Sequence, residues 1–207
     1  TSMHAHYFNP IFWVLTVFPV EKMLHGLSFL YVCASILTGV FTYKIGRHVG
    51  LTKANALLLS STSSLSWFAW FTYTTFIAAF MYPASLAAIW LILSWKNRNF
   101  FIQSFFLTLA FFQILIFTHP AYIFGFGAPA AVALFYALYI SKLQSERALL
   151  LLVTGIAFFL ALGLASYRLW PVLNHLITSS EFSLRNSGVF SKGLLHSAIT
   201  FMNPMGL

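Results

Sequence analysis

Residues 148–167 read ALLLLVTGIAFFLALGLASY and contain no Lys, Arg, Asp or Glu. A helix needs about 20 consecutive apolar residues to cross the hydrocarbon core of a bilayer, and this stretch has that length. Three other runs also lack these charges: residues 23–43, 54–95 and 99–141, which are 21, 42 and 43 residues long. Each of the two longest runs is about twice the length of one span, so each predicts a pair of helices. The sequence therefore predicts an all-α polytopic transmembrane bundle of about six transmembrane helices.

The composition agrees with this fold class. The 207 residues include 11 Lys or Arg and three Asp or Glu, so only 7% are charged, while 60% are hydrophobic. A soluble domain carries roughly 25% charged residues, and a disordered chain is poor in apolar residues. Both classes are excluded. The single cysteine, Cys33, excludes a scaffold stapled by disulfides.

The positions of the cations predict the orientation of the helices. Seven of the 11 Lys and Arg residues fall between the apolar runs, in three clusters: Lys44, Arg47 and Lys53; Lys96 and Arg98; Lys142 and Arg147. Short cytoplasmic loops carry an excess of Lys and Arg. We therefore expect the three clusters to be cytoplasmic and both ends of the chain to be external.

The two ends of the chain differ from the centre. The apolar run from Ile11 to Val20 is ten residues long, too short to span, so Tyr7–Val20 predicts a helix lying in the outer interface. Pro171 predicts a break after the last span. We expect one transmembrane domain over residues 1–207: an external interfacial segment at 1–22, six transmembrane helices at 23–167 and an external segment at 168–207. We also expect the chain to be an internal piece of a longer protein.

Few residues could carry acid–base chemistry. The carboxylates are Glu21, Glu146 and Glu181, and none lies inside a predicted span, where a proton or ion pump usually has one. Glu146 is interpreted as a solvated loop charge. His4 and His6 have the spacing of two metal ligands, but the sequence offers no third one nearby. No catalytic residue, metal site or cofactor is predicted from these residues.

The external helix ends hold the best candidates for binding a lipid phosphate: His119 at a predicted hairpin tip, Tyr167 and Arg168 at the last exit, and His4 and His6 before the interfacial helix. A guanidinium pairs with phosphate through two hydrogen bonds. A cation beside aromatic residues at a membrane boundary is also the pattern of a simple anchor, and His119 is also interpreted as a turn residue bonded to backbone. Residues 60–66, SSTSSLS, predict close helix packing and hydroxyl bonds to the preceding turn.

Four segments, taken in order, resemble the YfhO-like family of bacterial multi-pass membrane proteins. They are HYFNP (6–10), LTGVFTYKIGRHVGLT (37–52), HP (119–120) and LASYRLWP (164–171), the last followed by Ser180 and Arg185. The resemblance implies a C-type glycosyltransferase that uses a lipid-linked phosphosugar as donor at the external face of the bacterial inner membrane. It places the catalytic carboxylate of that superfamily in a loop preceding the matched segments. It therefore supplies no catalytic residue here, and any divalent metal would be held outside this chain.

Two other functions remain open at this stage. One is a non-catalytic integral membrane subunit that packs in a larger complex through faces such as Gly155, Phe159 and Gly163. The other, less favoured, is a transporter. Membrane lipids are the expected partners in every case, with protein partners in the membrane for the subunit, and no nucleic acid is expected. An external Asp or Glu shortly before Thr1 in the complete gene would favour the enzyme.

Overall fold

The computed structural model describes residues 17–71, 80–97, 99–116 and 120–178. Within these residues the chain is all-helical. The elements are η3 (Val20–Lys22), α2 (Met23–His48), α3 (Lys53–Phe71), α4 (Met81–Leu93), η5 (Trp95–Asn97), α5 (Phe100–Leu115), α6 (Pro120–Ile140) and α7 (Gln144–Thr178). The all-α prediction is confirmed, and the two long apolar runs each contain two helices. The predicted interfacial segment Tyr7–Val20 lies mostly outside the described residues.

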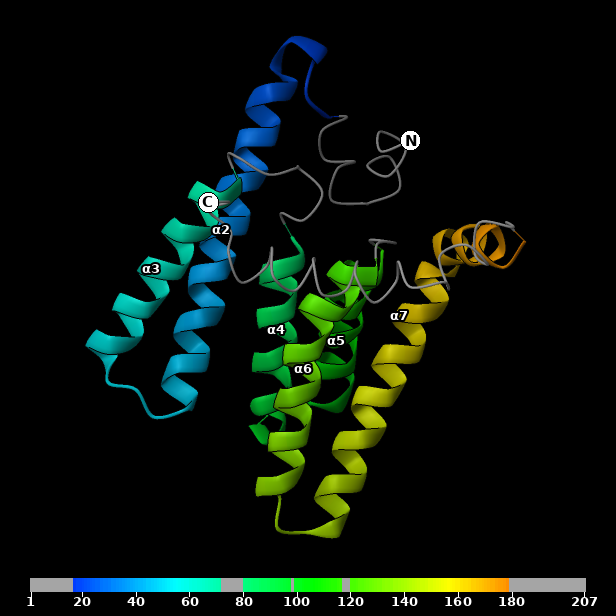
Figure 1. Ribbon diagram of the computed structural model, residues 1–207. Helices are drawn as coiled ribbons and strands as arrows, with labels where there is room; N and C mark the ends of the chain where they lie inside the picture. The colour runs from blue at the N-terminus through cyan, green and yellow to red at the C-terminus, as the bar shows by residue number, and fades with distance from the viewer. Residues whose placement is uncertain (1–16, 72–79, 98, 117–119, 179–207) are drawn as a thin grey trace, which may run out of the picture.

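The helices run in alternating directions. The α2–α3, α4–α5 and α6–α7 connections all lie at one end of the bundle, the lower end in Figure 1. The cationic clusters lie in these connections or in the helix turns beside them, so we call this the cationic end. Three cationic clusters that are far apart in the sequence are therefore at the same end of the bundle.

Two described segments are long and apolar enough to cross a membrane, His25–His48 and Gln144–Tyr167. Each has 24 residues, which corresponds to about 36 Å of helix against a hydrocarbon core of about 30 Å. Met81–Leu93, Phe100–Leu115 and Gly125–Ile140 are apolar but shorter. Large apolar side chains face outward, among them Phe101, Phe135 and Phe159, each more than two-thirds exposed. Both features indicate a membrane protein.

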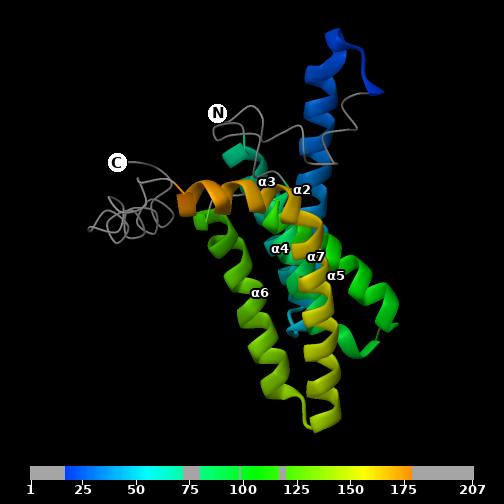
Figure 2. The ribbon, with the colours of Figure 1, turned by 90° about the vertical axis from the view of Figure 1, so that its right-hand side faces the viewer.

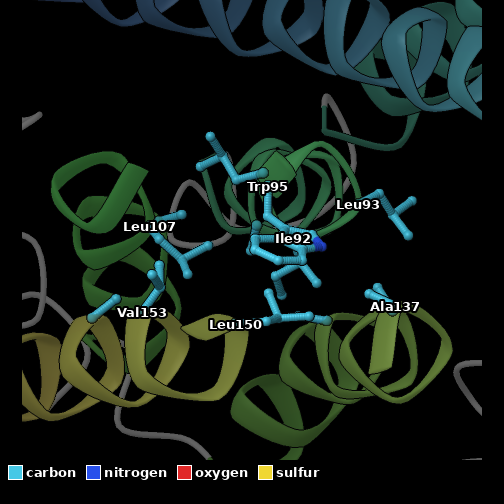
Figure 3. Close-up of a cluster of buried hydrophobic side chains, with 13 residues drawn as sticks. Ile92, Leu93, Trp95, Leu107, Ala137, Leu150 and Val153 are labelled. Atoms are coloured by element: carbon cyan, nitrogen blue, oxygen red, sulfur yellow. The ribbon is translucent and has the colours of Figure 1, made fainter. Parts of the chain in front are cut away.

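The central element is α4, which packs against α2, α5 and α6. Its inner residues Met81, Ala88, Leu91 and Ile92 are at most 3% exposed. Nearer the cationic end, the buried cluster combines side chains from α4, α5, α6 and α7. Figure 3 shows this cluster. Ile92 and Trp95 lie above Leu150 in this view, Leu107 and Val153 lie to the left, and Ala137 lies to the right.

Polar bonds join α4 to its neighbours. The buried Gln103 of α5 donates from Nε2 to the carbonyl oxygen of Leu91 at 2.8 Å, and Ser85 donates to the carbonyl oxygen of Phe126 in α6 at 2.6 Å. On the α2 side, the ammonium of Lys44 lies 4.1 Å from the centre of the Trp90 ring, a distance typical of a cation–π contact. These contacts tie α4 to α2, α5 and α6.

The serine-rich stretch of α3 packs on α2. Ser64 donates to the carbonyl oxygen of Ser35 at 2.8 Å, and Ser35 donates to that of Ser64 at 2.9 Å. Ser60 donates to the carbonyl oxygen of Gly39 at 2.7 Å. A Cβ at Gly39 would lie 3.3 Å from the Ser60 hydroxyl, so the glycine permits this close approach. The predicted helix packing is confirmed, but the partner of α3 is α2 and not the next helix, α4, with which it makes few contacts.

The hydrogen-bonded contact between α2 and α3 leads to a prediction about stability. Replacing Ser64→Ala removes the hydroxyl that bonds across the α2–α3 interface, and interhelical hydrogen bonds in membranes contribute about 0.6–1.7 kcal/mol. We expect the free energy of unfolding in detergent micelles to fall by about that amount. Ser66→Ala is the matched control, because Ser66 is an exposed serine of the same helix. An equal loss of stability in both variants would contradict a stabilising role for the Ser64 hydroxyl between α2 and α3.

Candidate functional site

The structure describes little of the predicted phosphate site. His4, His6 and His119 lie outside the described residues, and the side chain of Arg168 on α7 is also outside them. Tyr167 is described, and it is 48% exposed. Trp170, three residues further along α7, is 70% exposed. The aromatic residues expected around Arg168 are therefore exposed, and the proposed cluster of five residues stays a prediction.

The end of the last helix differs from the prediction. The helix does not end at Pro171, because α7 continues to Thr178. Its last turns change direction and run across the end of the bundle opposite the cationic end (Figures 1 and 2). Proline removes one helical hydrogen bond and crowds the preceding turn, which kinks a helix without always ending it. The sequence predicted a break at Pro171, whereas the helix continues through this residue to Thr178.

At the cationic end, two connections are joined by an ion pair. The ammonium of Lys96 lies 2.8 Å from Oε2 of Glu146, so η5 after α4 meets the first turn of α7. Glu146 was interpreted as a solvated loop charge, but its side chain is only 24% exposed and has this partner. Sequence spacing could not predict the pair, because 50 positions separate the two residues. Their meeting depends on how α4, α5 and α7 pack.

Two of the arginines that the structure describes at this end, Arg147 and Arg47, bond to backbone. Arg147 donates from Nε to the carbonyl oxygen of Ser141 at 2.9 Å, and Arg47 donates from Nη1 to that of Leu51 at 2.7 Å. Each bond holds a guanidinium beside its own connection. Among the described residues, no group of three or more His, Cys, Asp or Glu side chains could hold a metal ion. The two hydrogen bonds of Arg147 and Arg47 therefore stabilise the connections on which these residues lie.

An apolar cavity of about 620 Å³ lies between α5, α6 and α7. A connection of three residues joins α6 to α7, yet the two helices diverge from it (Figure 2) and barely pack against each other. The walls include Gly127 and Leu134 of α6, Leu151 and Phe158 of α7, and Leu115 of α5. Pockets for small apolar ligands commonly have this size. A second apolar hollow, of about 520 Å³, lies along α7 between Leu151 and Leu160.

Two features of the cavity wall decide what it can hold. Thr154 lines the cavity, but its hydroxyl oxygen is covered by protein and has no hydrogen-bond partner among the described residues. A Cβ added at Gly127 or Gly155 would meet nothing within 4 Å, so a side chain there has room to enter the hollow. The cavity thus suits hydrocarbon. Gly155 was interpreted from sequence only as part of a packing face, and its role in the cavity was missed.

Comparison of the chain with protein-family models, with curated proteins and with solved structures finds no match.

The ion pair at the cationic end can be tested by a double-mutant cycle with Lys96→Gln and Glu146→Gln. Half-exposed pairs of this kind contribute about 0.2–1 kcal/mol, so we expect a coupling energy in that range from unfolding in detergent. The control cycle combines Glu146→Gln with Lys53→Gln, a cation on another connection, and we expect no coupling there. Equal coupling in both cycles would contradict a specific pair.

Proposed function

We propose that this chain is the transmembrane core of a glycosyltransferase-like protein that uses a lipid-linked phosphosugar at the external face of the bacterial inner membrane. The observation that supports this most is the shared position of the three cationic connections at one end of the bundle. By the positive-inside rule this end faces the cytoplasm. The opposite end is then external, which is where the resemblance to the YfhO-like family expects the substrate.

In this proposal all six helices cross the membrane. The shortest, α4, has 13 residues and measures about 20 Å, less than the thickness of the core. It is surrounded by α2, α5 and α6, so its ends are covered by protein and need not reach the lipid headgroups. A short helix is compatible with a polytopic bundle when its neighbours shield it from lipid.

The proposed phosphate site lies at the external end. The bent last turns of α7 run across this end, with Tyr167 and Trp170 exposed. A guanidinium at position 168 can form two charge-assisted hydrogen bonds with a phosphate. His119, His4 and His6 would add further donors from neighbouring external segments. The donor lipid would approach this site from the outer leaflet.

A non-catalytic membrane subunit is the second candidate, and one observation favours it. Of the carboxylates whose side chains the structure describes, Glu146 is paired with Lys96 and Glu21 is exposed near the start of α2. Neither belongs to a cluster of metal ligands. The complete gene distinguishes the two candidates, because an external carboxylate before Thr1 favours the enzyme and its absence favours the subunit.

Two variants of the full-length protein test the proposed site. Arg168→Lys keeps the charge but loses the two-bond geometry, and His119→Ala loses a donor. We expect each to weaken binding of a polyprenyl phosphate about tenfold or more, because charge-assisted bonds of this kind contribute about 1.5–3 kcal/mol. Arg47→Lys, at the cationic end, is the control and should bind normally.

The corresponding polyprenyl alcohol separates phosphate recognition from binding of the chain, and we expect its affinity to be the same in all three variants. Wild-type affinity for the phosphate in both Arg168→Lys and His119→Ala would reject the external phosphate site. These residues would then be an ordinary membrane anchor and an ordinary turn residue.

A further inference from the structure

The depth of the cavity between α5, α6 and α7 limits what can fill it. Along α7 the cavity extends from Leu151 to Phe158, which lie about 10 and 21 Å from the start of the helix at Gln144. On α6 it extends from Leu134 to Gly127, about 9 and 20 Å from the cationic end of that helix. Half of a bilayer with its headgroups is about 20–22 Å thick. The cavity therefore begins about 9–10 Å from the cationic end and reaches the last residues of α5, Ile114 and Leu115, a depth that one acyl chain from the adjoining leaflet can fill.

The cavity lies where α6 and α7 separate, so its contents can come directly from the bilayer. Empty apolar cavities exclude water, and an unfilled one loses the dispersion contacts of its walls. A hydrocarbon chain supplies these contacts, because the side chains that line the cavity are apolar apart from Thr154, whose hydroxyl oxygen is covered. A lipid chain that enters from the side is thus the natural occupant.

Two cationic side chains on the α6–α7 hairpin favour a lipid with an anionic headgroup. Lys142 and Arg147 are exposed at the α6–α7 connection, and the bond from Arg147 to Ser141 holds the guanidinium there. The nearest carboxylate in sequence, Glu146, is paired with Lys96 of the other connection. Two cations above an apolar cavity match the chemistry of a lipid with an anionic head and an acyl chain.

We propose that the α6–α7 hairpin binds one anionic phospholipid of the cytoplasmic leaflet, with its phosphate at Lys142 and Arg147 and one acyl chain in the cavity. This inference rests on the orientation given in the proposed function, and it concerns a different lipid in the opposite leaflet from the donor. The bound chain replaces the missing contact between α6 and α7. The lipid is thus a structural part of the bundle.

The test uses full-length protein equilibrated with vesicles of equal parts phosphatidylglycerol and phosphatidylcholine with identical chains. Lipid retained after extraction in mild detergent is counted by native mass spectrometry. Gly127→Leu and Gly155→Leu fill the cavity from positions where a side chain meets nothing within 4 Å. Gly163→Leu is the matched control, because Gly163 is equally open but does not line the cavity.

We expect the wild-type protein and Gly163→Leu to retain one phosphatidylglycerol, and the two cavity-filling variants to retain little of either lipid. Lys142→Gln and Arg147→Gln should each lower the preference for phosphatidylglycerol over phosphatidylcholine about fivefold. Lys53→Gln, a cation on the α2–α3 connection, should leave the preference unchanged. Two cavity variants are used so that one with an altered melting temperature does not decide the result.

Wild-type retention in a folded cavity-filling variant would overturn the proposal, as would equal retention of the two lipids by the wild-type protein. This failure is distinct from failure of the proposed function. Arg168→Lys should leave retention of phosphatidylglycerol unchanged, and Gly155→Leu should leave affinity for the polyprenyl phosphate unchanged. Each proposal can therefore fail while the other holds.

Discussion

The bundle depends on the burial of α4 between α2, α5 and α6. Burial without strain requires small residues where the backbones approach, and Ala84 and Ala88, at most 9% exposed, meet this need. Burial also requires partners for polar groups, because an unsatisfied donor costs more in an apolar interior than a bond contributes. Gln103 and Ser85 donate to carbonyl oxygens across the helix contacts. The other helices are arranged around this core.

The two parts of the bundle, the α2–α3 pair and the group of α4, α5, α6 and α7, differ in their main contacts, although polar bonds occur in both. The α2–α3 pair is joined by serine hydroxyls across a close approach at Gly39, whereas the cluster of α4, α5, α6 and α7 at the cationic end is apolar. In the second part, α6 packs on α4 and α7 packs on α5. Because α6 and α7 pack against different helices, they separate from each other. The cavity is a consequence of this arrangement.

The sequence predicted what local composition and spacing determine. Apolar runs located the helices, and the cationic clusters identified the connections that share one end. Contacts between distant residues were not predictable, because they depend on packing. The ion pair of Lys96 with Glu146, the choice of α2 as the partner of α3, and the cavity are of this kind. Gly155 is an example of a role that the sequence does not determine. A glycine in an apolar helix predicts a close contact with another helix, but Gly155 lines the cavity. The predicted phosphate site falls largely on residues outside those described.

The central claim is that the three cationic connections lie on one side of a membrane that the bundle crosses. Single cysteines at Thr52, Ser145 and Ser187, in a background with Cys33→Ser, measure this by labelling with an impermeant thiol reagent in sealed, oriented vesicles. The account predicts that Thr52→Cys and Ser145→Cys react only from the cytoplasmic side and that Ser187→Cys reacts only from the external side. Reaction of Thr52→Cys and Ser145→Cys from opposite sides, or of Ser145→Cys and Ser187→Cys from the same side, would contradict it.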